Sequence, residues 1–117
     1  MKKVFILDDD KDVIEVLKHI LGRQYEVVCR TNADGLLSAI TSFNPDLILM
    51  DNCIGEQNAA DVVVHLRQSN PSFSVPIILF SAAHNINDIA AAIGTTAYLA
   101  KPASIQEIRD YVKRYTD

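Results

Sequence analysis

The chain has 117 residues, enough for one domain of ordinary size, and we expect a single domain over residues 1–117. Its 15 acidic and 11 basic side chains give a formal net charge of −4, which argues against a surface for nucleic acid, so we expect no direct nucleic-acid binding. No apolar run approaches the roughly 20 residues of a membrane span, and acids directly follow the first short apolar run, so we expect neither a signal peptide nor membrane contact. The two cysteines lack metal or disulfide spacing, and we therefore expect a cytoplasmic protein.

Short apolar runs alternate with stretches in which apolar residues recur at helical spacing. In chain order, the pattern predicts strands over 4–7, 26–29, 47–50, 77–80 and 97–100, each followed by a helix, over 13–21, 36–40, 62–66, 86–93 and 105–112. Most strand runs are apolar at consecutive positions, as expected when helices cover both faces of a parallel sheet. Five such units predict a doubly wound α/β fold with right-handed crossovers.

Acidic residues close two of the predicted strands, at the edge where such sheets bind ligands. Asp8, Asp9 and Asp10 follow the first strand and Asp51 follows the third, so carboxylates from separate strands are expected to meet. They would repel one another unless a hard cation lay among them, and magnesium (Mg2+) prefers one or two carboxylates with waters and phosphate oxygens. The alternative for Asp8, Asp9 or Asp10 is that the side chain caps the following helix.

Two further polar residues are expected at the same edge, Ser81 after the fourth strand and Lys101 after the fifth. A lysine there can neutralise an anion bound beside the carboxylates, and a serine hydroxyl can donate to one of its oxygens. Taken alone, Lys101 would be a solvated charge and Ser81 a turn residue. Because four strands deliver acids, a hydroxyl and an ammonium to one edge, the combination favours a functional site.

Four segments resemble the CheY-like receiver domain of two-component response regulators. The order and spacing of these segments over the whole chain carry the resemblance, which a single pair such as DD or KP would not. They are VFILDDD at 4–10, PDLILMD at 45–51, VPIILFSA at 75–82 and AYLAKP at 97–102. The resemblance implies a flavodoxin-like (βα)5 fold, with a five-stranded parallel sheet in the order 2-1-3-4-5 and helices on both faces.

The resemblance also implies roles for the residues at the acidic edge. Asp51 is similar to the phosphoacceptor, and Asp8 and Asp9 are similar to acids that bind Mg2+ together with it. Cys53 would offer its backbone carbonyl to the metal. Lys101 is similar to the lysine that pairs with the phosphoryl group, and the bond from it to Pro102 is implied to be cis, compatible with the general preference of cis bonds for proline.

Ser81 and Tyr98 resemble the hydroxyl and aromatic residues that move when such a domain is phosphorylated. Their movement would change the surface formed by the helix over 86–93, the strand over 97–100 and the helix over 105–112. That surface is therefore a candidate for partner binding and for a homodimer. The implied phosphoryl donor is a sensor histidine kinase or a histidine phosphotransfer protein.

The loop after Asp51 departs from the family's common pattern. Gly55, Glu56, Asn58 and Ala59 stand where a methionine–proline pair and an aspartate–glycine pair are common, so we expect a differently shaped loop. Ala103 stands where a phenylalanine often follows the proline. The departures remove no chemical group that phosphoryl transfer requires.

We therefore expect a receiver that takes a phosphoryl group onto Asp51 in a magnesium-dependent, self-catalysed reaction, and not a dedicated enzyme. One alternative is an interaction module that keeps the fold but acts without phosphorylation. Another is an aspartyl-phosphate hydrolase, which would need a second acid two residues after its nucleophile, where this chain has Cys53. His19, His65 and His84 are isolated in the sequence and are not expected to bind metal.

Overall fold

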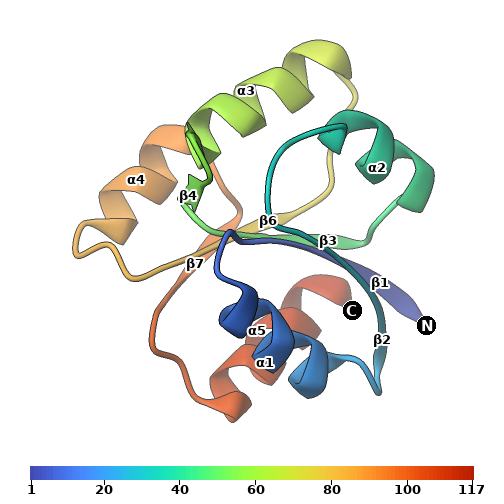
Figure 1. The fold of residues 1–117 in the computed structure, drawn as a ribbon, viewed down its shortest axis with the longest axis vertical. Helices are drawn as coiled ribbons and strands as arrows, with labels where there is room; N and C mark the ends of the chain where they lie inside the picture. The colour runs from blue at the N-terminus through green and yellow to red at the C-terminus, as the bar shows by residue number, and fades with distance from the viewer.

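A five-stranded parallel sheet runs through the centre of the molecule, with helices on both faces (Figure 1). This computed structural model describes all 117 residues. The strand order is β2-β1-β3-β6-β7, which is the expected order 2-1-3-4-5, because β6 and β7 are the fourth and fifth strands of this sheet. The five strands are β1 (Lys2–Leu7), β2 (Tyr25–Arg30), β3 (Leu47–Met50), β6 (Ile77–Ser81) and β7 (Ala97–Ala100).

The helices form two layers, as the doubly wound prediction requires. Figure 1 shows α1 and α5 on one face of the sheet and α2, α3 and α4 on the other. Their bounds are α1 (Lys11–Leu21), α2 (Leu36–Phe43), α3 (Ala59–Ser69), α4 (Ile86–Ile93) and α5 (Ile105–Thr116). None of them combines the length and the apolar character needed to cross a bilayer.

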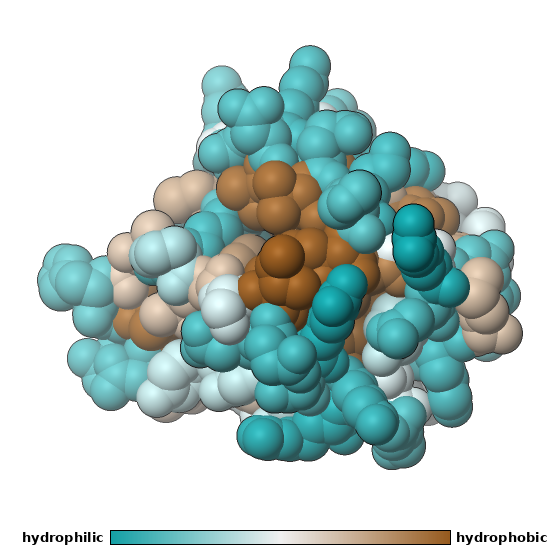
Figure 2. Space-filling model, turned by 90° about the horizontal axis from the view of Figure 1, so that it is seen from below, coloured by the Kyte–Doolittle hydropathy of each residue, from teal (hydrophilic) through white to brown (hydrophobic).

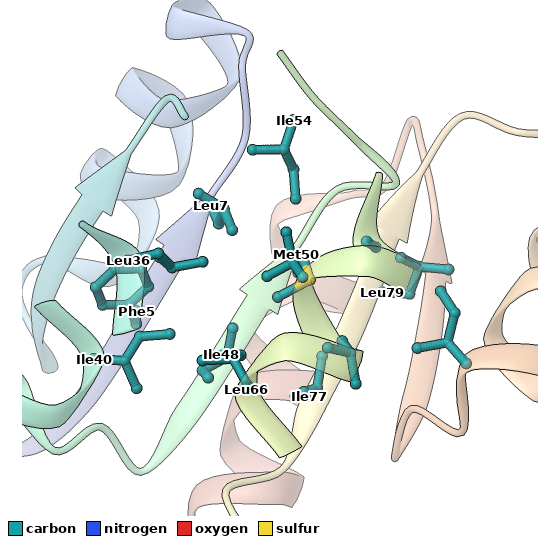
Figure 3. Close-up of a cluster of buried hydrophobic side chains, with 14 of the residues drawn as sticks. Phe5, Leu7, Leu36, Ile40, Ile48, Met50, Ile54, Leu66, Ile77 and Leu79 are labelled. Atoms are coloured by element: carbon teal, nitrogen blue, oxygen red, sulfur yellow. The ribbon is translucent and has the colours of Figure 1, made fainter. Parts of the chain in front are cut away.

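The sheet separates the core into two apolar clusters, and neighbouring residues of a strand belong to opposite clusters. Val4 and Ile6 of β1 pack with α1 and α5, whereas Phe5 and Leu7 pack with α2, α3 and α4. Figure 3 shows Phe5 and Leu7 on the same side of the sheet as Leu36 of α2. This alternation is the physical reason for the consecutive apolar residues in the sequence, because both faces of each inner strand are buried.

Polar side chains fix several helix ends. The Asp10 side chain caps α1 by accepting hydrogen bonds from two backbone N–H groups of the first turn. The Asn58 side chain caps α3 by accepting one hydrogen bond, from the backbone N–H of Asp61. Ser104 and Glu107 form a reciprocal capping box at the start of α5. At the far end of α4, the Arg67 guanidinium of α3 donates to the carbonyls of Ile93 and of the C-cap residue Gly94, at 2.8 and 2.9 Å.

The loop after Asp51 contains a small hairpin that the apolar pattern did not predict. Two-residue strands β4 (Cys53–Ile54) and β5 (Gln57–Asn58) pair antiparallel, and Gly55 in the turn has a positive φ of 62°. That conformation favours glycine, because it has no Cβ to clash with the backbone. Ile54 is 1% exposed and belongs to the core on the α3 side, so the hairpin is anchored to the domain.

Candidate functional site

The residues expected at the acidic edge continue the hydrogen bonding of the sheet just beyond the strand ends. The backbone N–H of Asp8 donates to a carbonyl of β2 at 3.1 Å, and that of Asp51 donates to a carbonyl of β1 at 2.9 Å. The backbone N–H of Lys101 donates to a carbonyl of β6 at 2.9 Å. Sheet pairing therefore fixes the backbone from which all three side chains project.

Three carboxylates converge at this edge. Asp8, Asp9 and Asp51 each place an oxygen so that the three atoms lie within 4.8 Å of one another. Asp8 is only 2% exposed, whereas Asp9 is exposed and Asp51 is half-buried. An all-oxygen donor set of this kind fits a hard divalent cation such as Mg2+. Asp10 does not join the cluster, because its side chain caps α1.

The Lys101 ammonium lies between two of these acids. Its Nζ donates to Oδ2 of Asp8 at 2.8 Å and to Oδ2 of Asp51 at 3.4 Å. Burial would lower the pKa of Lys101, but the hydrogen bond to Asp8 and the charges of both acids raise it above its ordinary value of 10.5. The lysine is therefore held in its charged form.

Asp8 is the acid most affected by burial. Desolvation raises its pKa above the ordinary value of 3.8, while the hydrogen bonds from Lys101 and from the backbone N–H of Asp10 act in the opposite direction. The net direction of the pKa shift is upward because burial outweighs both hydrogen bonds and the charge of Lys101.

Phe80 is part of this site, although the sequence did not single it out. It is the residue before Ser81 in β6, it is 5% exposed, and its ring centroid lies 5.2 Å from the Nζ of Lys101. The sequence signal was present, because Phe80 stands next to a predicted site residue on the strand beside β7. Periodicity alone marks such an aromatic residue only as core.

Ser81 and Tyr98, which the sequence suggested as switch residues, lie on the neighbouring strands β6 and β7. Ser81 ends β6, is 5% exposed, and accepts a hydrogen bond at Oγ from the backbone N–H of Ala83 at 3.2 Å. Tyr98 of β7 is 44% exposed and borders a surface hollow that Tyr111 and Tyr115 of α5 also line. The side chain of Cys53 is exposed at the start of β4.

The peptide bond between Lys101 and Pro102 is cis, as the resemblance implied. The sequence model of the response regulator receiver domain matches residues 4–113, which is nearly the whole chain. The chain belongs to the response regulator receiver domain family. Its CheY-like fold and its place among the proteins of two-component signalling follow from this membership.

The receiver domain is similar to characterised and structurally solved members of this family. It is 28% identical to the alkaline phosphatase synthesis transcriptional regulatory protein PhoP of Bacillus subtilis over 96% of this chain and 47% of that protein. A putative response regulator from Chloroflexus aurantiacus is 30% identical, with a TM-score of 0.86 and coverage of 98% of this chain and 97% of the other. The N-terminal domain of the nisin resistance regulator NsrR is 26% identical, with a TM-score of 0.87 and coverage of 100% of this chain and 99% of the other. The chain spans about half the length of the curated relatives it matches.

Proposed function

We propose that residues 1–117 act as one receiver domain that accepts a phosphoryl group on Asp51 from a sensor histidine kinase or a histidine phosphotransfer protein, with Mg2+ as cofactor. The observation that carries the proposal is the position of the Lys101 ammonium between Asp8 and Asp51, 93 and 50 residues away in the chain. A single structural ion pair needs only one carboxylate. A lysine among three converging acids suits the binding of an anion together with a cation.

Asp51 is the acid best placed to be the acceptor. Both carboxylate oxygens of Asp8 are engaged, one by the backbone N–H of Asp10 at 2.9 Å and one by Lys101 at 2.8 Å, and its side chain is 2% exposed. Asp9 has no bond to the lysine. The side chain of Asp51 is 13% exposed, and its Oδ2 lies 3.4 Å from the Nζ of Lys101. Its Oδ1 accepts a hydrogen bond from the backbone N–H of Asn52 at 2.7 Å. Its Oδ2 is therefore held beside a positive charge and remains reachable.

The transfer requires positioning and charge neutralisation more than a catalytic base. Oδ2 of Asp51 would form the new P–O bond while the P–N bond of the phosphohistidine breaks and the imidazole leaves with its electron pair. Lys101 would neutralise charge on the phosphoryl oxygens. Asp8, Asp9, Asp51 and the backbone carbonyl of Cys53 would hold Mg2+, which supplies further neutralisation of those oxygens when it is bound. The domain is thus a self-catalysed acceptor and not a dedicated enzyme.

The phosphorylated domain would signal through Ser81 and Tyr98. In the structure the Ser81 hydroxyl accepts a hydrogen bond from the backbone of its own loop, and the Tyr98 ring lies at the surface. About two negative charges added at Asp51 would favour a state in which the hydroxyl points toward the phosphoryl group and Tyr98 turns inward. The surface of α4, β7 and α5 would then bind a partner, or a second copy of the chain, differently.

Labelling with acetyl phosphate and magnesium, followed by intact mass measurement, tests the acceptor. We expect one added phosphoryl group on the parent and none on Asp51→Asn. Asp34→Asn is the matched control, because Asp34 is an exposed acid on the loop that leaves β2 at the same edge of the sheet. Undiminished labelling of Asp51→Asn would refute the assignment. A parent that takes no label at all would favour the interaction module that acts without phosphorylation.

A further inference from the structure

Phe80 and Lys101 both line an apolar hollow at the surface, and Lys101 also reaches the acidic edge. The hollow has a volume of about 490 Å3 and lies between α1 and the start of α5. Val13 and Leu17 of α1, together with Pro102 and the stem of Lys101, contribute to its lining. Figure 2 views the face that carries α1 and α5 and shows an apolar area surrounded by hydrophilic side chains.

The Lys101 ammonium contacts two carboxylates and lies over one aromatic ring. Its Nζ lies 5.2 Å from the centroid of the Phe80 ring, a distance at which the negative face of the ring attracts a cation. The side chain of Lys101 is only 17% exposed, so water screens this attraction weakly.

The two carboxylates cannot hold the ammonium throughout the proposed reaction. Asp8 is a proposed ligand of the metal, and Asp51 becomes an acyl phosphate when it accepts the phosphoryl group. Each carboxylate that Lys101 contacts would therefore have a second role in the proposed reaction. The Phe80 ring has no other polar partner, and its position within β6 does not depend on either event.

We propose that Phe80 is a positioning residue for phosphoryl transfer, whose ring face holds the Lys101 ammonium at the acidic edge while Asp8 and Asp51 are engaged with the metal and the phosphoryl group. This inference rests on the proposed function of Asp51. Lysine has a flexible four-carbon stem with many rotamers, so a fixed second contact restricts where its charge can lie. A leucine at position 80 would fill the core but leave the ammonium without that contact.

Fluorinated phenylalanines at position 80 distinguish a role in holding the ammonium from a role in filling the core, because they keep the size of the ring and weaken the negative charge of its face. Mono-, di- and trifluorophenylalanine should lower the initial rate of acetyl phosphate labelling stepwise. Phe80→Leu should lower it by roughly three- to thirtyfold, the range expected from a desolvated cation–π contact. Thermal melts would verify that each variant is folded.

Phe43 provides a matched control elsewhere in the molecule. The Nζ of Lys3 lies 5.5 Å from the centroid of the Phe43 ring, a similar geometry at a pair that does not touch the acidic edge. The same fluorinated series and Phe43→Leu should leave the labelling rate unchanged.

A second measurement does not depend on labelling. In NMR spectra of the metal-free protein, the ε-methylene protons of Lys101 should have ring-current shifts and nuclear Overhauser contacts to the Phe80 ring, and both should persist when magnesium is added. If the contacts disappear on adding magnesium, or if the fluorinated series leaves the labelling rate constant, Phe80 is only a core residue and the proposal is wrong. Should the parent take no label, the proposed function fails and the NMR contacts alone decide the role of Phe80, their persistence supporting it.

Discussion

Replacing Lys101 by methionine should destabilise the metal-free protein by about 2–3 kcal/mol at neutral pH. The estimate lies between roughly 0–1 kcal/mol for an exposed ion pair and about 3–5 kcal/mol for removing one partner of a buried pair. Asp8 is 2% exposed, which places it near the buried limit, whereas the side chains of Asp51 and Lys101 are 13% and 17% exposed. Without the lysine, Asp8 would remain buried and close to two other carboxylates.

The cost of this substitution should depend on pH in a defined direction. Burial raises the pKa of Asp8 above 3.8, so the folded protein takes up this proton at a higher pH than the unfolded chain does. Once Asp8 is protonated, Lys101 has lost its closest partner charge, and the difference between parent and variant should shrink as the pH falls from 7 toward about 4. At the alkaline end, the stabilisation by Lys101 should be lost as the pH rises above 10.5 and through the raised pKa of the lysine.

Urea unfolding in the presence of a chelator measures both effects, with the free energy of unfolding obtained by linear extrapolation. Lys18→Met is the control, because Lys18 pairs with Glu15 at 3.7 Å on side chains that are 51% and 74% exposed, and it should cost less than about 0.5 kcal/mol. A cost below about 1 kcal/mol for Lys101→Met, or an equal cost at pH 4 and pH 7, would contradict the interpretation that Lys101 compensates a buried charge.

Three further outcomes are expected. Asp9→Asn should weaken saturable binding of magnesium without phosphate, followed by tyrosine fluorescence or NMR, and unchanged binding would mean that the metal site is misplaced. Ser81→Ala should leave acetyl phosphate labelling measurable but reduce the phosphorylation-induced NMR shifts around Tyr98 and α4, so undiminished shifts would show that another path carries the signal. Arg67→Ala should accelerate amide hydrogen exchange in the last turn of α4 relative to α5, because its two hydrogen bonds satisfy carbonyls at that helix end; equal exchange would exclude that role.

The sheet and its helices could be predicted from the sequence because both faces of the sheet are buried. Consecutive apolar residues such as Val4 and Phe5 pack into opposite clusters, and this arrangement leaves a pattern that any buried parallel strand produces. The hairpin formed by β4 and β5 left no such pattern. Two-residue strands are too short for a period, and the positive φ of Gly55 that makes the turn is not visible in composition.

The sequence predicted which residues of the candidate site lie at one edge of the sheet, but not how their side chains contact one another. The rule that strand ends converge identified Asp8, Asp51 and Lys101, since it needs only topology. The ammonium lies closer to Asp8 than to Asp51, and this depends on how the side chains are buried. The same holds for the different positions of Asp8, which lies in the cluster, and Asp10, which caps α1. The contact with Phe80 depends on the face of β6 from which its ring projects, which a fully apolar strand does not reveal.

The acidic edge joins residue 8 to residue 101, and the backbones of Asp8, Asp51 and Lys101 are held in place by hydrogen bonds that they donate to carbonyls of the neighbouring strands. No local segment of the chain therefore contains the site. A partly folded chain in which β7 has not yet joined the sheet presents Asp51 without its lysine, and it would lack the positive charge that Lys101 offers to the phosphoryl oxygens. Under the proposed function, competence for phosphorylation appears only once β7 has joined the sheet, so a kinase would act on chains in which the sheet is complete.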